Sequence, residues 1–167
     1  MSQTTLIHSS TKVISWGKKI ILPATTGEEL FSTATGIAIG VTTMGFLEAN
    51  GFNSPGTPTD PVRVHVRQHR DNGTFLQMFG GLKSGLCKLC FQQGQVLAFA
   101  KKYRTWLHSS PGVETFSLVA MNEHLFVAGL WPGNELGSVG LSMHPFEYDC
   151  IWPEWRRHRM ITPVIQH

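Results

Sequence analysis

Residues 114–131 (ETFSLVAMNEHLFVAGLW) constrain the fold more than any other part of the sequence. Two runs of apolar, aromatic and β-branched side chains flank the polar pair Asn122-Glu123. Such runs, separated by a short polar turn, are typical of a β-hairpin. The second run ends at Pro132-Gly133, a pair that stops a strand. We therefore predict two core strands that turn at Asn122-Glu123.

Further strands are predicted on both sides of this hairpin. Residues 62–70 alternate valines with Arg63, His65 and Arg67, and the alternation places these basic side chains together outside the core. Asp71-Asn72-Gly73 then predicts a hairpin turn into another strand. The remaining strands are expected at residues 12–23, 75–78, 90–107 (one or two strands around Gly94) and 138–145.

One helix is predicted early in the chain. Thr25 or Thr26 can cap its first turn, where the acidic Glu28 and Glu29 offset the helix dipole. Asn50-Gly51 is a typical helix stop. Several glycines in between weaken the helix by about 1 kcal/mol each relative to alanine. After it, residues 53–61 contain three prolines and predict an irregular loop.

The overall class follows from this pattern and from the composition. The chain has 167 residues, of which 41% are hydrophobic and 15% charged, and this fits one globular domain with a substantial core. Dominant strands with one early helix predict an α+β fold built on a mixed, barrel-like sheet. We expect an N-terminal extension and first strand at 1–22 and the domain itself at 23–167.

Charge and cysteine content limit the functional classes. The formal net charge is +3, from 14 basic and 11 acidic residues, which is far below that of a charge-driven nucleic-acid binder. Cys87, Cys90 and Cys150 cannot all pair, and no secretory signal pattern is visible, so a reducing cytoplasm is expected. Residues 36–47 are too short for the roughly 20 residues of a membrane-spanning helix.

Six short motifs occur in a fixed order along residues 27–165. They are GEELF (27–31), GFNSPGTPTDPVRVHV (51–66), LQMFGGL (76–82), KKYRTW (101–106), LFVAGLW (125–131) and RHRMITPVI (157–165). In this order the chain resembles the SRAP domain, the SOS-response-associated peptidase family, whose motifs include YNIAPTQ-x-VPVV, MRWGL, GFYEW, FAFAGLW and HDRMPVI. That family attaches to abasic sites in single-stranded DNA. The resemblance implies an SRAP-type fold and a role in DNA repair.

The resemblance fails at the residues that carry the family's chemistry. The reaction begins with a cysteine that follows the initiator methionine, whereas position 2 here is Ser2. The glutamate of GFYEW is matched by Thr105, which cannot act as a general acid or base near neutral pH. The family's NAR segment has no counterpart, and His158 is shifted by one place, so that Arg157 takes the matching position. The resemblance therefore implies a pseudoenzyme, with His158 as the only residual catalytic candidate.

Basic and aromatic residues remain where the family binds DNA. Cations that contact phosphates, next to rings on which bases stack, are typical of single-strand binding. The residues expected to contact DNA are Arg63, Arg67, Arg104, Trp106, Trp155, Arg156, Arg157, His158 and Arg159. A packing role for the tryptophans, with the arginines as a solvated face, is the structural alternative.

Four functions stay open at the level of the sequence. The first is non-covalent binding of single-stranded DNA without a cofactor, and the second is a protein-binding or inhibitory module of a phage or mobile element. A third is a residual enzyme that uses His158 with a thiol such as Cys150. The fourth is a small zinc-stabilised domain, since Cys87-x-x-Cys90 has the spacing of zinc ligands, although a pair of buried apolar thiols is the more common use of it.

Overall fold

The computed structural model describes residues 11–82 and 84–165, and its strands form one eight-stranded sheet. The strands are β1 (Thr11–Val13), β2 (Ile20–Leu22), β3 (Ile37–Ile39), β4 (Val62–His69), β5 (Thr115–Met121), β6 (His124–Pro132), β7 (Val139–Pro145) and β8 (Arg159–Pro163). Their order is β1-β4-β8-β5-β6-β7-β3, with β2 also paired to β4. The β5·β8 and β3·β7 pairs are parallel and the other pairs antiparallel. The predicted strand-rich mixture of strands and helices is confirmed.

The helices of the described chain are short. They are α1 (Val41–Ala49), α2 (Phe75–Gly80), α3 (Gln93–Lys102) and the 3-10 helices η1 (Phe31–Thr33), η2 (Leu86–Leu89), η3 (Arg104–Trp106) and η4 (Glu154–Arg156). Within the described ranges, none has the length and apolar character needed to cross a lipid bilayer.

The predicted central hairpin is confirmed. Strand β5 pairs with β6 along its whole length, from Thr115 opposite Leu130 to Met121 opposite His124. Asn122 and Glu123 make the turn with φ angles of 49° and 66°. Positive φ at both central residues matches the twist of the two strands in a tight hairpin.

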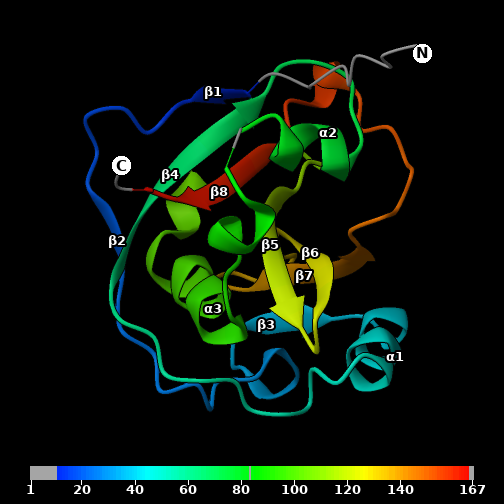
Figure 1. Ribbon diagram of the computed structural model, residues 1–167. Coiled ribbons are helices and arrows are strands. Elements are labelled where there is room, and N and C mark those ends of the chain that lie inside the picture. Colours follow the sequence, from blue (N-terminus) through cyan, green and yellow to red (C-terminus); the bar gives the residue numbers. More distant parts are fainter. Residues whose placement is uncertain (1–10, 83, 166–167) are drawn as a thin grey trace, which may run out of the picture.

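Both faces of the sheet are covered, and alternate residues of β5 enter two different cores. Val119 packs in a core that includes Phe99 of α3, whereas Phe116 packs in a second core with Phe75 of α2. Helix α3 therefore covers one face of the sheet and α2 the other (Figure 1). Because both faces of β5 are buried, its sequence is an almost continuous apolar run.

The long basic strand and its neighbours follow the prediction in part. Strand β4 occupies 62–69 as expected, but residues 12–23 form two short strands, β1 and β2, that are separated by Gly17 with φ 74°. Both pair with β4. The expected outward basic face holds for Arg63, whereas His69 at the end of β4 is 1% exposed.

The predicted helix from Thr25 to Asn50 is wrong in its first half. The Glu29 carboxylate accepts hydrogen bonds from the backbone N–H groups of Thr26 and Gly27, and this closes a turn. The chain then forms η1 and β3, which pairs in parallel with β7. Within residues 25–50, only α1 is α-helical, and its C-terminal cap is Asn50, as predicted. Pairing with β7 overrides the local helical preference here.

Two segments predicted as strands are helices. Residues 75–80 form α2, which begins with a capping box between Thr74 and Gln77. Residues 93–102 form α3, in which the Gln92 backbone N–H donates to the Gln95 side chain. Such reciprocal bonds satisfy the free N–H groups of a first turn. The turn signal at residues 71–73 favoured a following strand, and the glycine at 94 favoured a break between two strands. Neither helix start was therefore predicted.

We expect Glu123→Gly to stabilise the protein by about 0.5–1 kcal/mol, because a glycine adopts the positive φ of this turn without steric cost. Chemical denaturation measures the effect. Glu123→Ala removes the same carboxylate but keeps the unfavourable φ, so it serves as the control. A gain of equal size in both variants would assign the effect to charge rather than to backbone strain.

Candidate nucleic-acid interface

An exposed tryptophan with two arginines forms the most prominent basic surface of the C-terminal region. Trp155 and Arg156 lie in η4, and Arg157 follows directly. The Trp155 side chain is 72% exposed, and the Arg156 guanidinium carbon lies 5.0 Å from the centre of its ring. Arg156 and Arg157 are exposed as well. Stacked cations of this kind add a positive charge beside an accessible aromatic ring.

This segment is held by contacts to distant parts of the chain. Trp152 exchanges two backbone hydrogen bonds with Gly73, of 2.8 and 3.2 Å. The side-chain oxygen of Asn72 accepts from the Glu154 backbone N–H at 2.8 Å, and Arg156 Nη1 donates to the Gly112 carbonyl at 3.2 Å. The predicted turn at residues 71–73 thus acts as a clamp on the segment that carries Trp155.

Two hollows of about 360 and 410 Å³ lie on either side of Trp155 and Arg157, which line both. The first is also lined by His108 and Arg156, and the second by Lys12, Arg70 and Glu154. We call Trp155, Arg156, Arg157, Lys12 and Arg70 the Trp155 surface. Its four cations come from three separate parts of the sequence.

Other predicted contact residues have structural roles in the interior. Arg159 donates from Nη1 to the Trp106 carbonyl, and the Trp106 side chain packs against the core that contains α3. Arg67 donates from Nε to Thr162 Oγ1 at 3.1 Å, and burial lowers the pKa values of Arg67 and Arg159. These residues do not belong to the Trp155 surface.

Two further arginines lie away from that surface. Arg63 is exposed, but it lies near the start of β4, where it pairs with Ile21 of β2. At a rise of about 3.3 Å per residue, Arg63 is about 20 Å from the other end of β4. Arg104 lines a separate cavity beside α3. Of the nine residues predicted to contact DNA, the Trp155 surface contains Trp155, Arg156 and Arg157.

The prediction of a DNA contact for His158 is wrong, because its side chain is 0% exposed. Its ring stacks on Phe116 at 5.1 Å and meets Trp152 edge-on at 5.2 Å. Although it adjoins Arg157, it points into the second core, because Arg157 takes a left-handed conformation with φ 52° that reverses the chain direction locally. Because Arg157 and His158 are neighbours in the sequence, the sequence did not indicate that one side chain is exposed and the other buried.

A polar cluster lies at the sheet, between the residue before β5 and strand β7. The Ser142 hydroxyl donates to Glu114 Oε1, and His144 Nε2 lies 3.1 Å from Ser142 Oγ and 3.6 Å from Glu114 Oε1. The side chains of His144 and Glu114 are only 20% and 15% exposed. Burial by itself would raise the pKa of Glu114. The interactions with His144 and Ser142 together have the larger and opposite effect, so the pKa lies below its ordinary value. The cluster thus holds an ionised carboxylate.

Gly129 explains how this carboxylate fits against the sheet. A Cβ atom at Gly129 would overlap the Glu114 carboxylate and lie 2.5 Å from Ser142 Oγ. The glycine of the LFVAGLW motif therefore provides the space in which Glu114 crosses β6 to reach Ser142 on β7. Close approach of this kind is a common reason for a glycine inside a strand.

The backbone of Glu114 connects the cluster to His158. The Glu114 N–H donates to His158 Nδ1 at 3.0 Å, so in the neutral ring the proton resides on Nε2. His158 Nε2 has no hydrogen-bond partner among the described residues. Burial lowers the pKa of His158 to about 4, although the nearby Glu114 carboxylate opposes this shift. His158 is therefore neutral at pH 7.

Sequence inspection missed Glu114 and Ser142 as members of a site. Ser142 and His144 are two apart on a predicted strand, so their common face could have been recognised from alternation. Nothing local marked Glu114, because its partners are 28 to 44 residues away. Thr105, the residue that matches the glutamate of GFYEW, is exposed in η3, and the carboxylate beside His158 is instead Glu114. Ser2 lies outside the described residues.

The cysteines are free thiols in the described chain. Cys87 is exposed, while Cys90 donates from Sγ to the Leu86 carbonyl at 3.3 Å. Burial raises the pKa of Cys90 to about 11, which disfavours the thiolate that zinc requires. Among residues 11–82 and 84–165, no group of three or more His, Cys, Asp or Glu side chains is arranged to hold a metal ion.

Comparisons with models of protein families, with curated proteins and with solved structures find no match to this chain.

We expect Gly129→Ala to destabilise the protein by about 1–3 kcal/mol, because the added methyl displaces the Glu114 carboxylate from Ser142. Gly45→Ala in α1, where nothing lies within 4 Å of the new Cβ, is the matched control. It should be neutral or stabilising by about 1 kcal/mol. Equal unfolding free energies for wild type and Gly129→Ala would contradict the packing described for Glu114.

The lowered pKa of His158 predicts a pH dependence of stability. In the unfolded chain, His158 takes up a proton near pH 6.5, whereas in the folded protein it does so only near pH 4. The free energy of unfolding therefore falls as the pH is lowered from about 6.5 to about 4. The loss attributable to His158 approaches about 3 kcal/mol. His158→Asn keeps an acceptor for the Glu114 N–H and removes the titration.

Urea denaturation between pH 7 and pH 5 measures most of this effect and limits the contribution of carboxylates, which titrate mainly below pH 5. Other histidines contribute equally to both proteins, so the comparison isolates His158. Wild type should lose more stability than His158→Asn over this range. Parallel curves for the two proteins would show that the ring is not buried in its neutral form.

Proposed function

We propose that this protein binds single-stranded DNA non-covalently through the Trp155 surface. The observation that carries the proposal is the 72% exposed Trp155 ring between two hollows that are lined by Lys12, Arg70, Arg156 and Arg157. An exposed ring offers a platform for a base, worth about 1–3 kcal/mol, while the cations on both sides follow the phosphates.

A single strand suits this surface better than a duplex. The element that carries Trp155 is a 3-10 helix of three residues, too short to fill a major groove as a recognition helix does. Stacking on Trp155 requires an unpaired base, whose face is accessible only when the strand is open. The separate hollows give the nucleotides before and after the stacked base a place to lie.

The proposal includes the SRAP-like origin of the fold and the loss of its covalent chemistry. Glu114 is held by Ser142 and His144, and His158 is buried and neutral. In this view the protein is a pseudoenzyme that retains affinity for single strands, including those with an abasic site. A reducing cytoplasm is the proposed location, in keeping with the exposed free thiol of Cys87.

We expect Trp155→Ala to weaken binding of a labelled single-stranded oligonucleotide by about tenfold, as measured by fluorescence anisotropy. Arg157→Gln should weaken it less and lower the slope of affinity against salt concentration by about one unit. Trp16→Ala is the matched control, because Trp16 is also 72% exposed but lies beside His65 of β4, with the ring centres 5.8 Å apart. It should bind as the wild type does.

The same assay can reject the proposal. Absence of binding at low salt, where phosphate contacts are strongest, would exclude DNA and favour the alternative of a protein partner. Equal losses in Trp155→Ala and Trp16→Ala would move the contact away from the Trp155 surface. A complex with abasic DNA that survives a denaturing gel would contradict the non-covalent mechanism.

A further inference from the structure

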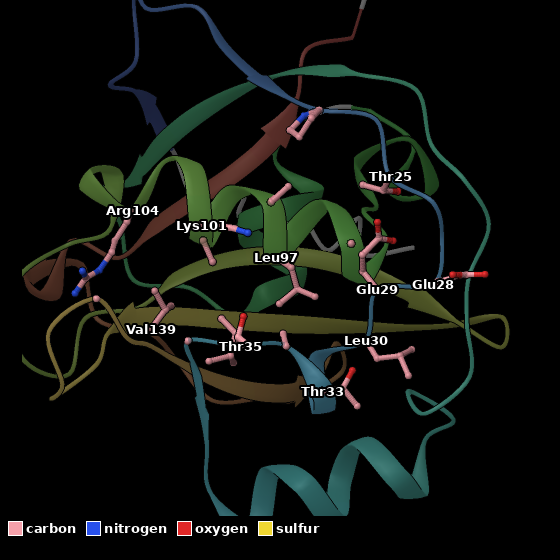
Figure 2. Close-up of a pocket in the computed structure, with 18 of the residues that line it drawn as sticks. Thr25, Glu28, Glu29, Leu30, Thr33, Thr35, Leu97, Lys101, Arg104 and Val139 are labelled. Carbon is pink, nitrogen blue, oxygen red and sulfur yellow. The ribbon is translucent and has the colours of Figure 1, made fainter.

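A cavity of about 630 Å³ lies between α3 and residues 23–37 (Figure 2). One wall consists of Gly94, Leu97, Ala98 and Lys101, which share one face of α3 because they are spaced by three and four residues. Leu30 is among the residues of the opposite wall. The volume is typical of sites for small molecules.

Hydrogen bonds fix the walls of this cavity. The Val139 backbone N–H donates to the Gly36 carbonyl at 2.8 Å and attaches the loop before β3 to the sheet. The Phe31 N–H donates to the side chain of Gln93 in α3 at 2.9 Å. The cavity is therefore bounded by elements that are tied to each other, and it does not depend on a loose loop.

The two ends of the cavity carry opposite charge. Figure 2 shows Arg104 and Val139 at one end and Glu28 and Glu29 at the other. Glu29 already accepts hydrogen bonds from the backbone N–H groups of Thr26 and Gly27, at 3.0 and 2.9 Å. Within the described chain, neither Arg104 nor Lys101 forms an ion pair with a carboxylate. Glu28 and Glu29 keep their negative charges, so an anionic group is repelled from their end of the cavity and attracted to the end that carries Arg104.

We propose that this cavity binds a small organic anion with an apolar, flat body, such as an aromatic carboxylate. The body lies against Leu97 and Ala98, and the anionic group faces Arg104, whose planar guanidinium matches a carboxylate. Lys101 adds a second positive charge on the same helix face. This site is separate from the Trp155 surface and goes beyond the DNA-binding function proposed above.

Fluorescence titration with 8-anilinonaphthalene-1-sulfonate tests the proposal, because this probe combines an aromatic body with one negative charge. We expect one saturable site in the wild-type protein. Arg104→Gln should weaken it about tenfold, since a charge-assisted hydrogen bond is lost. Lys102→Gln is the matched control, because Lys102 is exposed, lies over the Tyr103 ring and does not line the cavity. It should leave the affinity unchanged.

Ala98→Phe fills the cavity and should abolish the titration, while circular dichroism confirms that the variant folds. Competition gives a test that does not depend on that variant. Naphthalene-1-carboxylate should displace the probe about tenfold better than neutral 1-naphthalenemethanol, and Arg104→Gln should remove this preference. Equal displacement by both competitors in the wild type, or unaltered probe binding in folded Ala98→Phe, would overturn the proposal. Binding of DNA by Ala98→Phe should be unchanged, so the two functions can fail independently.

Discussion

The buried carboxylate of Glu114 is the constraint on which the C-terminal half of the structure depends. A largely buried charge is costly unless polar partners satisfy it. The Ser142 hydroxyl of β7 donates to Glu114, and His144 Nε2 of the same strand lies 3.6 Å from the carboxylate. The Glu114 backbone donates to His158 and its carbonyl accepts from Arg159 at 3.1 Å. The residue just before β5 therefore ties together β7, β8 and the segment between η4 and β8.

The Trp155 surface shows how a nearly neutral chain can present a locally basic face. The net charge is only +3, yet Lys12, Arg70, Arg156 and Arg157 gather around one exposed ring. The clamp at residues 71–73 and the bond from Arg156 to Gly112 hold the ring in place. A preorganised platform loses less side-chain freedom on binding, which is why the proposed DNA contact does not require a high total charge.

Prediction from the sequence succeeded where apolar and polar residues clearly alternate or where a turn is marked by its residues. The hairpin at Asn122-Glu123, most of β4 and β7 were found because their alternation or turn chemistry is local. It failed for α2 and α3, whose short amphipathic patterns carry little periodicity and whose starts depend on Thr74 and Gln92. The early helix was predicted too long because its first half forms a turn closed by Glu29, the 3-10 helix η1 and the strand β3, which pairs with β7.

The sequence by itself determined the strand-rich class, the central hairpin and the presence of basic and aromatic residues at 152–159. Only the tertiary structure decided which of those residues face solvent, since Trp155 is outside and His158 is inside although they are three residues apart. It also decided that Glu114 meets Ser142 and that Arg104 faces a cavity. The physical reason is that burial and pairing are set by contacts between residues distant in sequence, which no local pattern encodes.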